Sequence, residues 1–177
     1  MKKLIQTGLA VAITAISIGV NAEPTVSYIE YAIGDMDHDS GSSDDYSSLA
    51  LTFETPIVPL LSLELAEYGG TEISRIGVGD YIEVGSASYL YGLVHFNDYD
   101  PDFIDSDFSL TAGVNAQLTE RLELRLSLSE YTGDDTDGLS NTKIGLAYYL
   151  AGNASLSANY ANHDSFNVVS FSARLNF

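Results

Sequence analysis

Three segments of the chain are dense in aspartate and could bind a hard cation. Their acids are Asp35, Asp37 and Asp39; Asp98, Asp100 and Asp102; and Asp134, Asp135 and Asp137. Acids spaced by two residues are typical of the start of a Ca²⁺-binding loop, because Ca²⁺ prefers oxygen ligands. In the first segment, however, Ser40 takes the sixth position, where such a loop needs Gly, and Tyr46 takes the twelfth, where it needs Glu. The pattern favours solvated acidic loops, with weak, shared Ca²⁺ or Mg²⁺ binding as the alternative.

A second set of charges lies inside segments in which apolar and polar residues alternate. We assign each residue to a face by parity, that is, by its odd or even position within the alternating segment. On this basis the following charges share the polar face: Glu30, Glu54, Glu64 and Glu123, with Arg75, Arg125, Lys143 and Arg174. Four acids against four bases suit an enclosed interior, where an unpaired charge is costly. The set predicts either a polar core of ion pairs or the lining of a narrow pore. The filled state is favoured because side chains can fill the interior of a small barrel.

The overall charge restricts the classes of partner. Seven Lys and Arg residues against 25 Asp and Glu residues give a formal net charge of −18. Because phosphate contacts require clustered Lys and Arg, a nucleic-acid role is excluded. The absence of Cys excludes disulfides, thiolate metal sites and cysteine nucleophiles. Hydrophobic residues at 45% and aromatic residues at 11% argue against disorder.

Residues 1–22 have the pattern of a secretory signal peptide. A positive start precedes an apolar stretch, Leu4 to Val20, which small residues follow up to Ala22. This order predicts cleavage after Ala22 and export of residues 23–177 as a single domain. A transmembrane anchor is less favoured, because glycine and hydroxyl residues interrupt a run that is short for a span of about 20 residues.

Residues 23–177 show the period-two alternation of β-strands and no helical periodicity of useful length. The clearest run, Leu122 to Ser129, alternates over its whole length. The predicted strands are 26–34, 46–54, 60–68, 73–82, 87–96, 107–116, 122–131, 142–150, 154–161 and 166–177. If residues 73–96 formed one irregular segment instead of two strands, the number of strands would be eight. Both counts are even, as in single-chain bacterial outer-membrane barrels.

The connections between the predicted strands alternate in length. Long acidic connections, 35–45, 97–106 and 132–141, alternate with short ones, 55–59, 83–86, 117–121 and 151–153. Long loops at one end and tight turns at the other are the layout of a transmembrane β-barrel. We therefore predict an all-β fold, a closed antiparallel up-and-down transmembrane barrel of ten strands, with eight strands as the alternative.

The polar face indicates which side of the predicted strands lies inside. A soluble sandwich or barrel turns its apolar face toward a core. Here the polar face is rich in small uncharged residues, such as Ser48, Ser62 and Ser109, rather than Lys and Glu. Aromatic residues occur at strand ends, as in the girdles of a lipid interface. On the side of the long loops these are Tyr31, Tyr46, Tyr68, Phe96, Phe108, Tyr131, Tyr160 and Phe166. The sequence predicts apolar side chains facing lipid and polar side chains facing a lumen.

The end of the chain resembles a known assembly signal. The run from Ser172 to Phe177 resembles that of small Gram-negative outer-membrane β-barrel proteins, the OmpA- and OmpX-like porin-type family. The apolar positions of this signal are Leu175 and Phe177 within the run and Phe171 just before it. Runs 76–81, 90–94 and 120–128 are similar to strands of that family. The resemblance implies a location in the outer membrane of a Gram-negative bacterium and a monomer. It also implies contact with outer-membrane lipid and lipopolysaccharide, and recognition by the barrel assembly machinery during biogenesis.

Catalytic residues are difficult to assemble from this sequence. Asp98 with Asp100, and His163 with Asp164, resemble the paired residues of outer-membrane proteases, but the second pair is adjacent where the protease pair is spaced by two. No Ser is singled out beside His95 or His163, as a lipid-modifying barrel would need. We expect no enzyme, because a nucleophile, a base and an orienting group cannot be combined. We expect no cofactor beyond loosely bound Ca²⁺ or Mg²⁺.

The expected function is therefore a structural or surface-interaction barrel that presents acidic extracellular loops. The alternative is a narrow, cation-preferring porin-like channel, because an acidic mouth attracts cations. An outer-membrane enzyme and a soluble ligand-binding barrel are less favoured.

Overall fold

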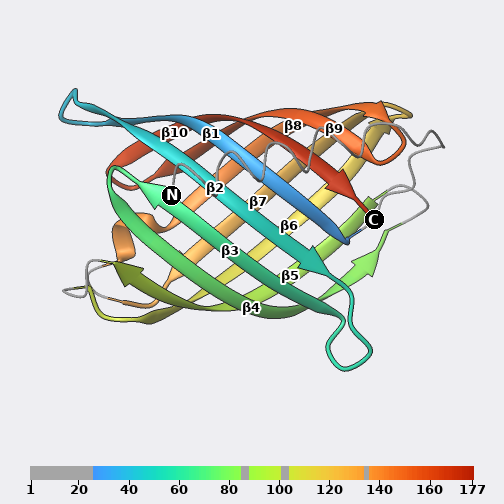
Figure 1. The fold of residues 1–177 in the computed structure, drawn as a ribbon, viewed down its shortest axis with the longest axis horizontal. Coiled ribbons are helices and arrows are strands. Elements are labelled where there is room, and N and C mark those ends of the chain that lie inside the picture. The colour runs from blue at the N-terminus through green and yellow to red at the C-terminus, as the bar shows by residue number, and fades with distance from the viewer. Residues whose placement is uncertain (1–25, 85–87, 101–103, 134–135) are drawn as a thin grey trace.

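The computed structural model describes residues 26–84, 88–100, 104–133 and 136–177, which form one closed antiparallel β-barrel (Figure 1). Its strands are β1 (Tyr28–His38), β2 (Ser43–Phe53), β3 (Leu60–Tyr68), β4 (Thr71–Glu83), β5 (Ser88–Asp100), β6 (Asp107–Thr119), β7 (Leu122–Tyr131), β8 (Asn141–Ala151), β9 (Ala154–His163) and β10 (Phe166–Asn176). Each strand pairs with its neighbours in sequence, and β1 also pairs with β10, which closes the sheet. The predicted all-β barrel of ten strands is confirmed.

Besides the ten strands, the described residues contain one helical element. One short 3-10 helix, η1 (Asp137–Leu139), lies between β7 and β8. Within the described residues, no helix is long and apolar enough to cross a membrane. The predicted signal peptide, residues 1–22, lies outside the described residues.

The two ends of the barrel differ, and we call them the loop side and the turn side. The loop side carries connections 39–42, 69–70, 101–106, 132–140 and 164–165, and the turn side carries 54–59, 84–87, 120–121 and 152–153. One of the two-residue loop-side connections is Gly69-Gly70, with φ of 55° and 92°. Two successive positive φ values match the twist of the flanking strands, and glycine adopts them without strain.

The strands run further toward the loop side than the sequence predicts. β1 continues to His38 and β5 to Asp100, so the expected loop 35–45 shrinks to residues 39–42. Backbone pairing continues there, because Asp35 stands opposite Asp45. The prediction of long loops at 35–45 and 97–106 is therefore wrong over much of their length. A change from apolar to polar side chains marked the expected strand ends, but it does not interrupt the backbone hydrogen bonds.

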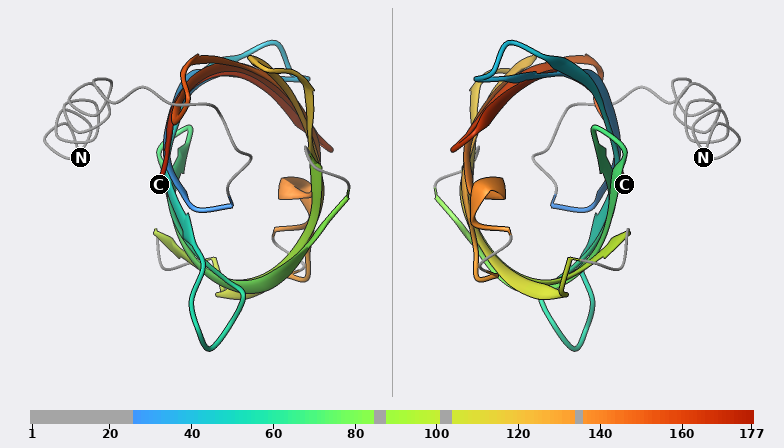
Figure 2. Two further views of the ribbon diagram at one scale, coloured as in Figure 1. Left: turned by 90° about the vertical axis from the view of Figure 1, so that its right-hand side faces the viewer. Right: turned by 90° about the vertical axis from the view of Figure 1, so that its left-hand side faces the viewer.

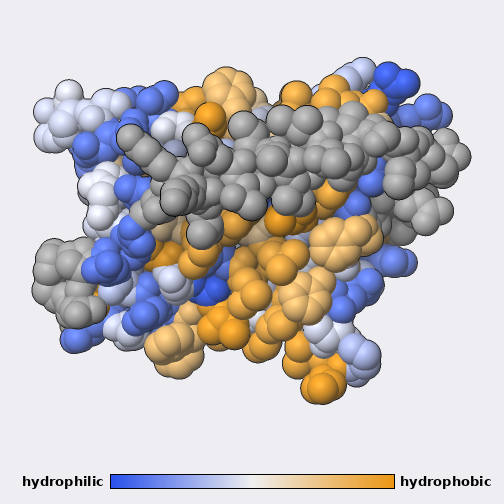
Figure 3. Space-filling view, in the orientation of Figure 1, coloured by the Kyte–Doolittle hydropathy of each residue, from blue (hydrophilic) through white to orange (hydrophobic). Residues whose placement is uncertain are grey.

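Apolar side chains cover the outside of the barrel. Ile76, Leu146 and Phe171 are 51%, 46% and 65% exposed, whereas Ser62 and Ser109 are buried inside. On the face seen in Figure 3, apolar side chains gather over the middle of the barrel and hydrophilic ones toward its two ends. The predicted arrangement, with the apolar face outward and the polar face inward, is confirmed. The alternative of a soluble barrel with its apolar strand faces turned inward does not fit this arrangement.

Small residues facing inward leave room for larger partners in the lumen. The ring of His95 lies over Gly77, the ring of Tyr91 over Gly113, and the amide of Asn159 in the place where a side chain of Gly145 would stand. In each case the glycine and the larger residue are directly opposite on paired strands. These glycines therefore leave room for the larger inward side chains of the neighbouring strands.

Candidate functional site

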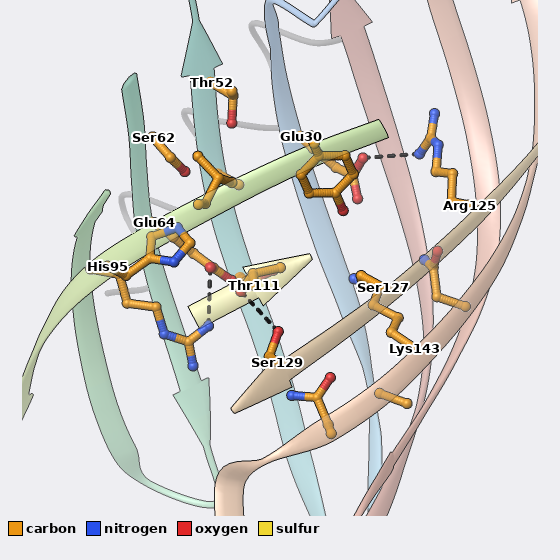
Figure 4. A pocket seen from close by; sticks show the side chains of 18 of the residues that line it. Glu30, Thr52, Ser62, Glu64, His95, Thr111, Arg125, Ser127, Ser129 and Lys143 are labelled. Atoms are coloured by element: carbon orange, nitrogen blue, oxygen red, sulfur yellow. Dashed lines mark hydrogen bonds and ion pairs between the residues drawn. The ribbon is translucent and has the colours of Figure 1, made fainter. Parts of the chain in front are cut away.

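A polar cavity of about 180 Å³ lies inside the barrel. Its lining includes Val26 and Leu60 toward the turn side, Tyr68 and His163 toward the loop side, and at least one residue from every strand. Figure 4 shows part of this lining, with carboxylate, guanidinium, ammonium and hydroxyl groups pointing inward from several strands. The lumen therefore contains a polar cavity within its filling of side chains.

Four charged residues form an ion-pair cluster in the turn-side half of the lumen. We call Glu30, Glu123, Arg125 and Arg174 the β1–β7 cluster. Glu30 Oε2 accepts hydrogen bonds from Arg125 Nη1, at 3.1 Å, and from Arg174 Nε. Arg125 Nε donates to Glu123 Oε1 at 2.5 Å. Because β1 and β7 are not neighbours in the barrel, the Glu30–Arg125 pair crosses the lumen (Figure 4).

Tyrosines complete this cluster. Tyr149 donates its hydroxyl to Glu123 Oε2 at 2.9 Å, and the guanidinium carbon of Arg174 lies 3.7 Å from the centre of the Tyr28 ring. Both arginines are nearly buried, and each is matched by a carboxylate. Paired in this way, buried charges rigidify the interior, whereas loss of one partner would leave an uncompensated charge.

A second ion pair joins β3 and β4 directly. Arg75 Nη1 donates to Glu64 Oε2 at 3.0 Å, and the guanidinium lies 5.3 Å from the centre of the Tyr131 ring. The remaining nitrogens of Arg75, Nε and Nη2, are buried and have no hydrogen-bond partner within the described residues. His95 Nδ1 is in the same state. This half of the lumen thus contains polar atoms whose hydrogen bonding is unsatisfied.

Lys143 stands apart from both sets of ion pairs. It lines the cavity from β8, and Figure 4 shows its side chain reaching inward. No hydrogen bond or ion pair of Lys143 occurs within the described residues. Its charge is therefore not neutralised by a direct contact.

Glu54, which the sequence assigns to the lumen, lies elsewhere. β2 ends at Phe53, so Glu54 follows the last residue of the barrel wall and is exposed. Its Oε1 accepts a hydrogen bond of 2.5 Å from the hydroxyl of Tyr81. Of the eight charged residues that parity assigns to the lumen, Glu30, Glu64, Glu123, Arg75, Arg125, Lys143 and Arg174 line the cavity or contact residues that line it. The expected balance of four acids and four bases becomes three acids and four bases.

Aromatic side chains narrow the loop-side end of the lumen, a feature that the sequence pattern did not predict. The His163 and Phe166 rings stack with 4.1 Å between centres, and Tyr68 packs edge-on against both. Tyr46, with its ring centre 5.0 Å from that of Tyr68, and Tyr131 also face inward. The prediction that Tyr46, Tyr68, Tyr131 and Phe166 belong to an outer girdle is therefore wrong. Phe96, Phe108 and Tyr160 do face outward. Parity could have found the difference, since Tyr46 shares the face of Ser48.

A buried aspartate holds the connection between β7 and β8 against the barrel. Asp107 accepts hydrogen bonds from Asn97 Nδ2 at 2.7 Å, Tyr99 Oη at 2.8 Å, Gly133 N at 3.1 Å and Thr136 Oγ1 at 2.5 Å. In the end-on views η1 lies inside the outline of the barrel wall (Figure 2). The sequence gives no signal that separates Asp107 from the neighbouring solvated aspartates.

The same connection contacts the aromatic end of the lumen. Leu139 packs against the buried cluster that includes Met36 and Phe166, and its carbonyl oxygen lies 3.0 Å from His163 Nδ1. Residues of this connection therefore cover part of the loop-side mouth. Together with the β1–β7 cluster, they narrow the lumen at two levels.

The candidate cation ligands do not converge. Asp35, Asp37, Asp39, Asp98 and Asp100 are exposed, and four of them lie on the extended parts of β1 and β5. Asp102, Asp134 and Asp135 lie outside the described residues, and Asp137 begins η1. In the described part of the chain, no group of three or more His, Cys, Asp or Glu residues is arranged to hold a metal ion.

The paired residues weighed for catalysis are also separated. Asp98 and Asp100 are exposed on the outside of β5, and Asp98 accepts a hydrogen bond from Ser106. His163 is buried inside the barrel.

The assembly-signal residues Phe171 and Phe177 are both exposed, and Leu175 shares their outward parity at the end of β10.

Comparisons with known proteins give a result at the level of fold. No family model matches the sequence, and a sequence search of curated proteins gives no match. Among solved structures, the KdgM porin is similar with a TM-score of 0.56 and 10% identity, over 85% of this chain and 99% of that one. The NanC porin gives 0.55 and 10%, over 84% and 100%. Omp33, an outer membrane protein of Acinetobacter baumannii, gives 0.50 and 8%, over 90% and 100%.

These similarities agree with what the barrel itself displays. At such low identities they establish a shared fold and carry no assignment of solute. The apolar exterior, the closed sheet and the polar lumen are the features of a transmembrane barrel. The chain therefore has the fold and the surface of a porin-type outer-membrane β-barrel.

Proposed function

We propose that this protein is a porin-like outer-membrane barrel whose narrow lumen admits small polar solutes. The observation that supports the proposal is the polar cavity, which every strand lines inside an apolar exterior. A fully packed polar core would leave no such cavity. With about 180 Å³, it holds on the order of ten water molecules, so only small solutes fit without rearrangement.

Two contacts limit passage through this lumen. The Glu30–Arg125 pair crosses it, and the connection that holds Leu139 covers part of the loop-side mouth. Because small barrels have interiors that side chains can fill, we expect low conductance in this conformation. Removal of the crossing arginine should widen the passage.

Planar-bilayer recordings of refolded residues 23–177 test the proposal. We expect small discrete conductance steps, which Arg125→Ala enlarges by at least twofold. Arg121→Ala is the matched control, because Arg121 is exposed in the turn between β6 and β7. A barrel that inserts but shows no steps, either as wild type or as Arg125→Ala, would contradict a solute passage.

A structural or surface-interaction role is the second candidate. The observation that favours it is the extension of β1, β2 and β5 into polar, acidic segments on the loop side. These rigid extensions would present carboxylates above the apolar band. The pairing that a protease-like site would need is not formed, because His163 faces inward whereas Asp98 and Asp100 are exposed outside.

A further inference from the structure

The basic residues of the barrel have an uneven distribution. After residue 22 the sequence contains five Lys and Arg residues, and four of them, Arg75, Arg125, Lys143 and Arg174, line the lumen. The fifth, Arg121, is exposed on the turn side. The outer surface is thus strongly acidic, whereas the lumen holds almost all the positive charge of the folded domain.

Carboxylates neutralise only three of these four cations. Glu30 and Glu123 match Arg125 and Arg174 within the β1–β7 cluster. Glu64 matches Arg75. Within the described residues no carboxylate contacts Lys143. Among the charged residues that line the cavity or pair with its lining, one positive charge is therefore uncompensated, which is unfavourable unless a counter-ion or water accompanies it.

Arg75 supplies a second incomplete group on the same cavity. Its side chain is 10% exposed, and its ion pair with Glu64 uses Nη1 alone. The unpartnered atoms, Nε and Nη2, form the side edge of the guanidinium, which can give two parallel hydrogen bonds to one carboxylate. Lys143 and Arg75 lie in the loop-side half of the lumen, near the beginnings of β8 and β4.

We infer that the lumen binds a small monovalent anion between Lys143 and the free edge of Arg75, with a carboxylate preferred over a halide. The inference rests on the proposed function and names the class of solute for the same cavity. Of the neighbouring carboxylates, Glu64 is paired with Arg75 and Glu30 with two arginines, while Asp107 is already held by four neutral donors at the loop-side end. Binding beside the uncompensated charge of Lys143 gives an anion preference, in contrast to the cation preference that the acidic loops predict.

Chloride linewidth in ³⁵Cl NMR measures such binding directly in detergent. We expect refolded residues 23–177 to broaden the chloride signal and acetate to remove the broadening at lower concentration than nitrate does. Lys143→Gln should weaken chloride binding by at least tenfold. Arg121→Gln, which changes the net charge equally at an exposed position, should leave it unchanged.

Two further variants separate charge from geometry. Lys143→Arg keeps the charge and should retain binding. Arg75→Lys keeps the charge but removes the two-pronged edge, so it should bind chloride normally and lose the preference for acetate. The folded state of each variant is checked by the difference in gel mobility before and after heating.

Failure of this inference can be distinguished from failure of the proposed function. Chloride binding without bilayer conductance supports the anion site and contradicts the passage. Conductance without excess broadening in the wild type overturns the anion site alone. Equal binding by wild type, Lys143→Gln and Arg121→Gln also overturns it.

Discussion

Among the described carboxylates of the lumen, Glu30 is the one that forms ion pairs with two arginine side chains. Its Oε2 accepts from both Arg125 and Arg174. Removing one partner of a buried ion pair is strongly destabilising, because the other charge stays buried. We expect Glu30→Gln to lower the free energy of unfolding by about 3 kcal/mol.

Glu54→Gln is the matched control, since parity alone would place both glutamates inside. Because Glu54 is exposed beyond the end of β2, its replacement should change the free energy of unfolding by less than about 0.5 kcal/mol. Urea unfolding of the refolded barrel in lipid vesicles, followed by gel mobility, measures both values. Equal losses in the two variants would contradict the position assigned to Glu54.

Gly113 carries a packing constraint that its residue type alone does not reveal. A methyl group there would meet the ring of Tyr91, which lies directly opposite on β5. We expect Gly113→Ala to displace this ring into the lumen and to cost about 1–3 kcal/mol, as overpacking does. Gly92→Ala, where the nearest atom of another residue is a backbone oxygen at 4.0 Å, should cost nothing. The same unfolding assay compares the two, and a harmless Gly113→Ala would count against the close approach.

At the scale of the element, the loop-side strand extensions bring like charges together. Glu67 on β3 stands opposite Glu72 on β4, and Glu72 stands opposite Asp100 on β5. Like charges directly opposite on paired strands destabilise the pairing. We expect Glu72→Gln to raise the free energy of unfolding by about 0.2–1 kcal/mol at low salt, and by less as salt screens the repulsion.

Glu83→Gln supplies the comparison on the same strand, because Glu83 stands opposite Tyr89 at the turn side. Chemical unfolding at two salt concentrations gives the answer. A gain that is equal for both variants, or that does not depend on salt, would show that cross-strand repulsion is not its cause.

Periodicity predicts the strands of this barrel well and their loop-side ends poorly. The run from Leu122 to Ser129 reveals β7 because outward and inward environments differ so strongly. Asp35 and Asp98 look like loop residues because they lie outside the apolar band, yet their backbones remain paired. Side-chain chemistry reports where the apolar band ends, whereas backbone pairing decides where a strand ends.

Side-chain chemistry also limits what could be predicted of the lumen, because it shows which residues face inward and not which of them make contact. Parity identifies the inward face, and it places Arg125 and Lys143 there. It does not reveal that Arg125 has partners while Lys143 has none, because pairing across a barrel depends on strand tilt and stagger. Asp107 could not be recognised at all, since the donors that surround it come from β5 and from the distant connection after β7.

At the scale of the whole molecule, one face of every strand must be compatible with lipid. Leu126 is 36% exposed on the outside of β7, and Ser127 shares the inward face of Glu123 and Arg125. We expect Leu126→Arg to cost about 2–4 kcal/mol at the middle of the bilayer and to block insertion, whereas Ser127→Arg is tolerated better. The fraction of heat-modifiable barrel after refolding into vesicles measures the difference. Equal damage from both changes would be inconsistent with the assigned faces.

Fluorescence quenching by brominated lipids tests the central claim most directly. The chain contains no tryptophan, so a single inserted tryptophan can be followed against a background of tyrosines. Tryptophan at Leu63 or Leu146 should be strongly quenched by lipids brominated on their acyl chains, and tryptophan at Ser62 or Ser127 only weakly. Strong quenching at the two serine positions, or weak quenching at both leucine positions, would contradict a barrel with lipid outside and a polar lumen within.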